Sequence, residues 1–381
     1  MNGASARRVR VLIVDDSVVT REIICDHLAQ SPGIEVAGVA CDGCEALRVF
    51  DSVRPDVVTL DVHMPNMDGL ATLDALFDRK SVPVIMVSSL TQLGADTTFE
   101  ALDRGALDYV AKPDRGSETE EIFGSELVRK IRNAAGADVQ RILRIRRERK
   151  LSRRHKQRAC PPASPASSSG MAHACIAIGV STGGPPALTG LFAALRPPMP
   201  PILVVQHMPP QFTKPLAWRL NSLSELSIQE AAGGEVPRPN HVLIAPGGRH
   251  MELRRHGGLV KTVLSDGPPV SSHKPSVDVM MQSVAAIFGP NCLGVIMTGM
   301  GRDGVEGCRS IRQAGGYVLG QNEATSDVYG MNKVAYVEGC VNRQFALDEA
   351  PSQIAQEVRR LLQSSPAPAH WRAAAKEEVV R

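Results

Sequence analysis

The sequence of 381 residues predicts two α/β domains joined by a basic segment of linker composition. Short apolar runs rich in β-branched residues alternate with segments of helical spacing, which is typical of parallel sheets covered by helices. This alternation occurs in two separate regions, and a Pro-, Ser- and Gly-rich run, CPPASPASSSG (160–170), lies between them. The chain is long enough for each region to bury a core of its own.

Composition and charge exclude several classes of protein. Hydrophobic residues make up 43% and charged residues 22% of the chain, and the formal net charge is only +3, which does not indicate a nucleic-acid-binding polycation. No apolar run approaches the roughly 18 residues of a membrane span. The N-terminus, MNGASARRVRVLIVDD, has neither the apolar core nor the cleavage site of a secretion signal. We therefore expect a cytoplasmic protein.

The cysteines do not form a recognisable metal or disulfide pattern. Only Cys41 and Cys44 have the CxxC spacing, and no second pair completes a zinc site. We expect isolated reduced thiols rather than redox or metal chemistry.

In the first region, five apolar runs predict the strands of an open parallel sheet. The predicted strands are 8–14, 34–40, 56–62, 82–89 and 108–112, and segments of helical spacing separate them at 21–30, 44–53, 70–80 and 97–106. This pattern predicts a flavodoxin-like domain at 8–125.

The segment 126–171 is predicted to be a helix followed by a linker. Its basic run, RILRIRRERKLSRRHKQR (141–158), fits a solvated helix that leads into a tether. Docking of an acidic partner and contact with nucleic acid remain alternatives, although the run lacks aromatic residues that would stack on bases.

The second region predicts a mostly parallel, doubly wound sheet at 172–362, followed by a polar tail at 363–381. The runs 174–180, 201–207 and 292–299 are predicted to be buried strands, each followed by turn residues and a helical segment. The stretch 241–265 looks more like antiparallel ribbons inserted in the middle.

Carboxylates follow two of the predicted strands of the first region. Asp15 and Asp16 come directly after the first strand, and Asp61 closes the third. Functional side chains of open α/β sheets gather outside the carboxyl ends of the strands, so the three should converge. Such like charges repel unless a divalent cation lies among them, and oxygen ligands suit Mg²⁺.

Two further polar residues are expected at the same edge. Ser88 closes the fourth strand and Lys112 the fifth. A hydroxyl and an ammonium there could hold the oxygens of an incoming phosphoryl group. Taken singly, an Asp pair is usually a helix cap and a Lys-Pro pair a loop; the specific signal is the whole set.

Residues 8–125 closely resemble the receiver domain of two-component response regulators. The resemblance implies that Asp61 is the phosphoacceptor and that Asp15, Asp16 and Asp61 hold Mg²⁺. It also implies that Ser88 is the switch hydroxyl, that Lys112 binds phosphate, and that Tyr109 is the aromatic rotamer switch. One departure is His63, at a position often acidic in this family, which bears on how fast the phosphoryl group is lost.

In the second region, Ser181 follows a predicted strand within IAIGVSTGGPPAL. Residues 179–183 match GxSxG, the pattern of a nucleophile at a strand-to-helix turn. Glycines permit such a turn and leave N–H groups free to bind an oxyanion. A glycine-rich turn after a strand is just as often a phosphate cradle, so this motif leaves both interpretations open.

A histidine and an aspartate follow two other predicted strands of this region. His207 ends the next strand, and Asp303 lies in a Gly-rich turn after a third. Alone, each is more commonly a cap or a turn residue. Together with Ser181 they form the set that acyl transfer requires, with His207 as base and Asp303 as the acid that orients it. The order Ser, His, Asp differs from that of the α/β-hydrolases, which argues against that fold.

Five segments of the second region resemble the catalytic domain of the CheB family of chemotaxis receptor methylesterases. They are IGVSTGGP, VQHMP, IAPGGRHMEL, KPSVDVMMQSVA and MTGMGRDG, and the resemblance covers about 172–345. It implies that Ser181 is the nucleophile, His207 the general base and Asp303 the orienting acid. Thr182 and the N–H of Met300 are implied to assist the histidine and the oxyanion.

The same resemblance implies a substrate, a reaction and a regulator. The expected reaction is demethylation of glutamate methyl esters on chemotaxis receptors with release of methanol, together with deamidation of receptor glutamines. A histidine kinase would supply phosphate, Mg²⁺ would serve only the receiver, and the esterase chemistry needs no cofactor. We expect the receiver to cover the catalytic edge until phosphorylation of Asp61 favours an uncovered form. Asn332 replaces the usual proline of the family, which leaves local loop geometry in question.

Two rival hypotheses belong to other classes of protein. The basic run 141–158 motivates a response regulator whose output domain binds nucleic acid, but no recognition-helix domain follows the receiver. The other rival is a non-catalytic regulator of a receptor array, in which the triad residues act only by docking.

Overall fold

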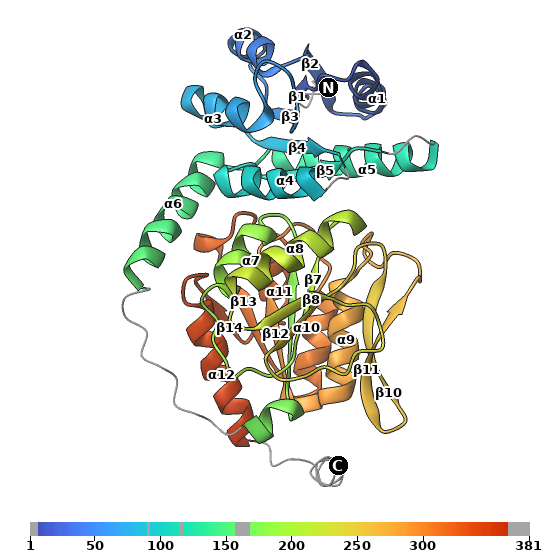
Figure 1. Ribbon diagram of the computed structural model, residues 1–381, viewed down its shortest axis with the longest axis vertical. Helices are drawn as coiled ribbons and strands as arrows, with labels where there is room; N and C mark the ends of the chain where they lie inside the picture. Colours follow the sequence, from blue (N-terminus) through green and yellow to red (C-terminus); the bar gives the residue numbers. More distant parts are fainter. Residues whose placement is uncertain (1–6, 90–91, 114–116, 157–167, 365–381) are drawn as a thin grey trace, which may run out of the picture. The chain divides into compact units, whose positions relative to one another are not determined.

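The computed structural model describes residues 7–89, 92–113, 117–156 and 168–364 (Figure 1). Most of the predicted linker run and the predicted tail lie outside these ranges. The chain divides into two compact units after Arg147. None of the helices in the described ranges combines the length and the apolar character needed to cross a membrane.

The N-terminal unit is built on a parallel five-stranded sheet with the order β2-β1-β3-β4-β5, which confirms the predicted flavodoxin-like arrangement (Figure 1). Helix α1 packs against α5, while α3 packs against both α2 and α4, so helices cover both faces. The elements of this unit are β1 (Val9–Val14), α1 (Val18–Ala29), β2 (Ile34–Ala40), α2 (Gly43–Val53), β3 (Val57–Asp61), α3 (Gly69–Arg79), β4 (Val84–Ser88), α4 (Gln92–Arg104), β5 (Asp108–Ala111) and α5 (Ser117–Ala134).

Local sequence explains where several of these helices begin. Ser17, Asp42 and Asp68 stand one residue before α1, α2 and α3, and each side chain accepts a hydrogen bond from a backbone N–H of the first turn. Helix α6 (Val139–Lys156) follows α5 and carries most of the basic run. The helical part of the segment predicted at 126–171 is therefore two helices rather than one.

The C-terminal unit is built on a parallel seven-stranded sheet with the order β14-β13-β12-β6-β7-β9-β8 and a separate antiparallel ribbon, β10-β11. Its elements are η1 (Ser168–His173), β6 (Cys175–Val180), α7 (Gly184–Phe192), β7 (Ile202–Gln206), α8 (Pro210–Leu223), β8 (Ser227–Glu230), β9 (His241–Ile244), β10 (His250–His256), β11 (Leu259–Ser265), α9 (Val277–Phe288), η2 (Gly289–Asn291), β12 (Cys292–Ile296), α10 (Val305–Gln313), β13 (Tyr317–Gln321), η3 (Glu323–Thr325), α11 (Met331–Val337), β14 (Arg343–Phe345) and α12 (Ala350–Ser364).

One part of the predicted antiparallel insertion is wrong. Residues 241–244 form β9, which pairs in parallel with both β7 and β8 inside the main sheet. Only β10 and β11 form an antiparallel ribbon, with His250 opposite Ser265 and His256 opposite Leu259. Val242 and Ile244 are fully buried, as strands inside a parallel sheet require.

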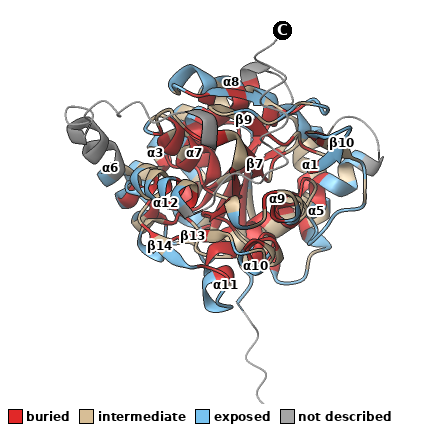
Figure 2. Ribbon diagram, turned by 90° about the horizontal axis from the view of Figure 1, so that it is seen from below, coloured by how far each residue is buried: buried red, intermediate tan, exposed pale blue. Residues whose placement is uncertain are grey.

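The three central strands of the C-terminal sheet are fully buried, and polar residues follow shortly after they end. Every residue of β6, β7 and β12 is buried. Exposed residues lie on loops, on the outer sides of helices and on the outer strands, including the β10-β11 ribbon (Figure 2). Strand β6 lies between β12 and β7, so residues just after these three strands are neighbours at one edge of the sheet.

Candidate active site and acidic pocket

Ser181 stands on a tight turn between β6 and α7. Its N–H donates to the Thr298 carbonyl at 3.0 Å, and its own carbonyl accepts from the Gly184 N–H at 2.8 Å. Gly183 precedes α7 with a φ of 77°, the left-handed region that favours glycine. The turn therefore presents the Ser181 side chain beside the N-terminus of a helix, where the helix dipole favours negative charge.

Close packing explains the glycines of this turn. A Cβ atom on Gly184 would collide with the amide of Gln206, and one on Gly183 would lie 2.7 Å from the Cβ of Asp327. The Gln206 amide nitrogen in turn donates to the carbonyls of Ser181 at 3.1 Å and His207 at 3.0 Å. Gln206 thus ties the serine turn to the histidine turn, a role that sequence reasoning missed.

His207 directly follows β7, and strand register brings it beside Ser181. Val180 pairs with Gln206, so Ser181 and His207 are the next positions on two neighbouring strands. Adjacent strands lie about 4.8 Å apart. The His207 N–H donates to the Val180 carbonyl at 3.2 Å, which continues the pairing to the end of the strand.

Asp303 contacts the ring of His207 from the loop after β12. The distance from His207 Nε2 to Asp303 Oδ2 is 2.7 Å, and Asp303 is fully buried. The same carboxylate accepts from Ser276 Oγ at 2.7 Å, from the Val277 N–H at 2.7 Å and from the Asp278 N–H at 3.2 Å. These donors belong to the N-terminus of α9, so the acid is held by a helix end as well as by the histidine.

The environment keeps Asp303 ionised. Burial pushes the pKa of this carboxyl upward, but hydrogen bonds from His207, Ser276 and Val277 outweigh burial and lower the pKa to about 2. A carboxylate accepts from an N–H, so Nε2 of His207 carries the proton in the neutral ring and Nδ1 carries the lone pair.

Nδ1 of His207 is buried and has no hydrogen-bond partner within the described ranges. Within the described residues, Nδ1 of His207 therefore makes no hydrogen bond to Ser181. Catalytic hydrogen bonds are often long before substrate binds. The nitrogen that faces away from Asp303 is therefore the one available as a base.

Thr182 and Met300 flank the same turn. The Thr182 carbonyl accepts from Thr298 Oγ1 at 3.0 Å. The Gly299 N–H donates to Val328 at 3.0 Å and the Gly299 carbonyl accepts from Met331 at 2.9 Å, which fixes the loop. Among the described residues, no backbone hydrogen bond engages the Met300 N–H, so it is available to an oxyanion.

Asn332, at the position where the resemblance leads us to expect a proline, is buried in the first turn of α11. Its side-chain amide donates to the Gln321 carbonyl and to Ser326 Oγ, each at 2.8 Å. A proline has no side-chain donor, so Asn332 replaces a rigid turn residue with hydrogen bonds to the end of β13.

His207, His273 and Asp303 carry ligand atoms within 4.8 Å of one another, which suggests a metal site. The rings of His207 and His273 are stacked, however, with centroids 3.8 Å apart and planes only 13° from parallel. The lone pair of an imidazole nitrogen lies in the ring plane, so two stacked rings cannot both direct lone pairs at one ion about 2.0 Å away. The arrangement does not fit zinc.

In the N-terminal unit, Asp15, Asp16 and Asp61 form a second group whose carboxylate oxygens lie within 4.8 Å of one another. Lys112 Nζ lies 2.9 Å from both Asp15 Oδ2 and Asp61 Oδ2. Asp15 and Asp61 are buried, whereas Asp16 is exposed. The strand ends therefore bring together the acids and the lysine that the sequence predicted for this pocket.

Electrostatics in this pocket favour a further cation. Burial and the nearby Asp61 raise the pKa of Asp15 to about 6, against the opposing effect of Lys112. Burial likewise raises the pKa of Asp61. One ammonium does not offset the cost of burying two carboxylates, and an all-oxygen group of this kind fits Mg²⁺.

Three further residues considered for the receiver lie on β4, on β5 and in the loop after β3. Ser88 is fully buried, and its hydroxyl donates to the Gly94 carbonyl at 3.2 Å. Tyr109 is 2% exposed, with the Lys130 ammonium 4.9 Å from its ring centroid. His63 is exposed, two positions after Asp61.

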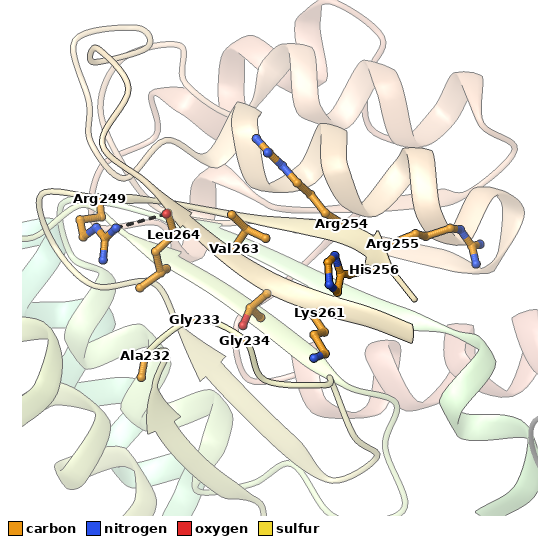
Figure 3. A pocket seen from close by; sticks show the side chains of 11 residues that line it. Ala232, Gly233, Gly234, Arg249, Arg254, Arg255, His256, Lys261, Val263 and Leu264 are labelled. Carbon is orange, nitrogen blue, oxygen red and sulfur yellow. Dashed lines mark hydrogen bonds between the residues drawn. The ribbon is translucent and has the colours of Figure 1, made fainter. Parts of the chain in front are cut away.

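A hollow of about 480 Å³ lies elsewhere on the C-terminal unit, along the β10-β11 ribbon (Figure 3). Its basic residues extend in different directions rather than toward one point, as Arg254, Arg255 and Lys261 show in the figure. Arg249 pairs with Asp266 at 2.9 Å, and Arg254 pairs with Glu252 at 3.2 Å. The hollow therefore lacks the convergent groups of an anion site.

Comparisons with known proteins agree on both halves of the chain. A family described as CheB methylesterase matches residues 176–354, and one described as response regulator receiver domain matches residues 11–140. A protein-glutamate methylesterase/protein-glutamine glutaminase of Anaeromyxobacter dehalogenans (strain 2CP-C) is 44% identical over 93% of this chain and 95% of its own length. The protein of the same name from Pyrococcus horikoshii is 40% identical over 92% and 94%.

Two solved structures from Thermotoga maritima match the two units separately. The CheB methylesterase catalytic domain is 38% identical and covers 48% of this chain and 97% of its own, with a TM-score of 0.47. The CheB response regulator domain is 42% identical and covers 35% and 99%, with a TM-score of 0.33.

Proposed function

The chain belongs to the CheB family of protein-glutamate methylesterases/protein-glutamine glutaminases, and we propose that it acts on methylated glutamates of chemotaxis receptors under the control of its receiver domain. The single observation that carries the esterase reaction is the 2.7 Å contact between His207 and Asp303 at the strand end beside Ser181. Phosphorylation of the receiver activates hydrolysis, and receptor glutamines are deamidated by the same groups.

In the proposed reaction, Ser181 Oγ attacks the carbonyl carbon of a glutamate methyl ester while His207 Nδ1 takes its proton. Asp303 holds the ring through Nε2 and stabilises the imidazolium that forms. The oxyanion of the tetrahedral intermediate lies at the N-terminus of α7 and at the N–H of Met300. Methanol leaves with the proton returned by His207.

The second half of the reaction repeats these steps with water. His207 takes a proton from water, which attacks the glutamyl ester of Ser181, and collapse of the second intermediate restores the serine and releases glutamate. A glutamine amide follows the same route, because its nitrogen can leave as ammonia after protonation by His207. Thr182 belongs to the same proposal as a residue that orients the histidine.

The receiver contributes the acidic pocket to this proposal. Asp15, Asp16 and Asp61 would hold Mg²⁺, which would neutralise charge during phosphoryl transfer to Asp61. Lys112 binds the phosphoryl oxygens. Ser88 is the switch hydroxyl, and Tyr109 is the aromatic residue that changes rotamer on phosphorylation. A histidine kinase is the proposed phosphodonor, and we place both reactions in the cytoplasm. The proposed domains are 8–125 for the receiver and 172–362 for the esterase.

The Ser181→Ala variant tests the esterase reaction. Without the nucleophile, methanol release from methylated receptors should fall by about 10⁶-fold. Ser222→Ala is a matched control, because Ser222 is an exposed serine of α8 in the same unit. A Ser181→Ala protein with near-normal turnover would overturn the proposed function, as would a wild-type protein that a serine-reactive probe fails to label at Ser181.

A further inference from the structure

His273 lies on a tight turn that follows the β10-β11 ribbon and precedes α9. The N–H of Val270 donates to the His273 carbonyl at 3.0 Å, and the N–H of His273 donates to the Val270 carbonyl at 2.9 Å. The two residues between them, Ser271 and Ser272, have φ of 50° and 64°. Two-residue turns of this kind usually take Asn and Gly, because other side chains are strained at positive φ.

This turn places the imidazole of His273 against the ring face of His207. The ring centroids of His207 and His273 are 3.8 Å apart, and the ring planes differ by 13°. The orientation of the His273 ring is fixed by its Nδ1, which lies 2.7 Å from the Ser271 carbonyl and donates to it. The His207 side chain is only 7% exposed.

Stacking supplies a constraint that the Asp303 contact lacks. A hydrogen bond at Nε2 fixes one atom of the His207 ring but leaves the ring free to tilt about that atom. Tilting would move Nδ1 away from Ser181, and small misplacements of a base are costly in rate. A flat surface against one face of the ring removes this freedom.

We propose that His273 is a positioning residue for His207: its stacked ring fixes the plane of the base so that Nδ1 faces Ser181. This inference rests on the proposed function, in which His207 is the base. His273 exchanges no proton with substrate in this role. Its contribution is a planar ring at stacking distance from His207, which another aromatic side chain can also provide.

Three variants separate the flat face from the chemistry of the ring. His273→Ala and His273→Gln remove the face, and both should lower kcat for methanol release by about 10- to 100-fold with KM changed less than about twofold. His273→Phe keeps a planar face without ring nitrogens and should retain kcat within about fivefold of wild type. His256→Ala is a matched control, because His256 is an exposed histidine at the tip of the ribbon.

Each outcome decides the proposal. Wild-type kcat in the Ala or Gln variant overturns it, and so does a Phe variant as slow as these two, since that result assigns the role to a ring nitrogen. If the Ala protein fails to fold, the comparison of Gln with Phe still tests the stacked face.

A spectroscopic measurement separates this inference from the proposed function. In the full chain labelled with ¹⁵N-histidine, the proton of the neutral His207 ring should stay on Nε2 in both proteins, but the ring signals should be sharp in the wild type and broadened by ring motion in the Gln variant. This readout needs no substrate. Broadened His207 signals in the Gln variant together with no esterase activity in the wild type would leave the positioning role standing and remove the methylesterase function.

Discussion

Asp303 uses both of its carboxylate oxygens in contacts that serve two purposes. Oδ2 contacts His207 Nε2 and the Val277 N–H, while Oδ1 accepts from Ser276 Oγ and the Asp278 N–H. One group thus contacts the proposed base and satisfies N–H groups that would otherwise be unpaired at the start of α9. Charge-assisted hydrogen bonds of this kind are stronger than neutral ones.

Replacing Asp303 with Asn tests the orienting role. An amide nitrogen facing His207 would favour the wrong tautomer and place the proton on Nδ1, so methanol release should fall by about 10⁴-fold. The variant should also unfold more easily, by about 1–3 kcal/mol, because charged acceptors at a helix end are lost. Asp266→Asn, which alters an exposed carboxylate, is the control. Activity of the Asp303→Asn protein within tenfold of wild type would contradict the assigned role.

For single residues, the sequence was enough to predict which polar residues stand at strand ends, but not how their side chains are oriented. Ser181, His207 and Asp303 follow predicted strands, so a shared sheet edge was enough to bring them together. The ring nitrogen that faces Asp303 depends on loop positions that no local pattern specifies. His273 and Gln206 were missed for the same reason, since their contacts come from long-range packing. The groups that donate to Asp303 lie at the start of α9. The sequence signal for them is Ser276, a typical N-cap residue that precedes the apolar helix.

Carboxylates at the starts of α9 and α10 accept hydrogen bonds from the N-terminal N–H groups of the other helix. Asp278, in the first turn of α9, accepts from the N–H groups of Gly304 at 2.9 Å and Gly307 at 2.8 Å at the start of α10. Asp303, just before α10, accepts from the start of α9. The two acids are therefore close together and buried. These hydrogen bonds hold the loop that carries Asp303 against a neighbouring helix.

The closeness of these acids predicts a pH effect on stability. Burial, together with the negative charge of Asp303, raises the pKa of Asp278 from 3.8 to about 6 in the folded protein. Between these values the folded chain binds a proton that the unfolded chain does not, so stability falls as pH rises through this window. Above pH 6 the destabilising effect is complete.

Asp278→Asn removes this charge but keeps an oxygen that can accept from Gly304 and Gly307. The free energy of unfolding of the variant relative to wild type should therefore rise by about 1–3 kcal/mol between pH 4 and pH 7. Denaturant unfolding followed by tryptophan fluorescence is the measurement, because Trp218 lies in α8 of the C-terminal unit, the unit that contains Asp278. A difference between the two proteins that does not change with pH would show that Asp278 is not protonated in this window.

Among the elements, continuous apolar strands were mostly predictable, whereas polar strands and the direction of non-local pairing were not. The five strands of the first sheet were predicted with ends within about two residues, the usual uncertainty of such boundaries. Strands β8, β13 and β14 were not singled out; β8 and β14 contain exposed polar residues and so lack the continuous apolar run that marks other short strands. The parallel pairing of β9 was missed because its partner β7 lies far earlier in the chain, and local periodicity carries no information about direction.

At the scale of the whole molecule, the two sites lie in separate units. The acids around Asp61 belong to the unit before Arg147, and the Ser181 site belongs to the unit after it. The sequence predicted both units and both sets of residues, because each set follows the strands of its own sheet. It could not predict the size of the effect that one site has on the other, which depends on the relative energies of two states of the whole protein.

The presence of a receiver domain and an esterase domain in one chain predicts that phosphorylation controls hydrolysis. A small-molecule phosphodonor with Mg²⁺ should raise methanol release by the wild-type protein at least about tenfold, which requires phosphorylation to favour the active state by about 1.4 kcal/mol or more. Asp61→Asn should keep the basal rate and lose the response, because an amide cannot accept the phosphoryl group. Removal of Mg²⁺ with a chelator should also abolish the response but leave the basal rate unchanged, since the proposed esterase steps involve no metal.

The matched control for this experiment is Asp51→Asn, which alters an exposed carboxylate of α2 outside the acidic pocket and should respond like the wild type. Equal stimulation of the Asp61→Asn protein would show that the phosphodonor acts elsewhere. A wild-type rate that does not change with phosphodonor would separate the two units functionally and leave an unregulated esterase. A basal rate that falls on chelation would contradict the cofactor-free reaction at Ser181, because the loss would then occur in a step that does not involve the receiver.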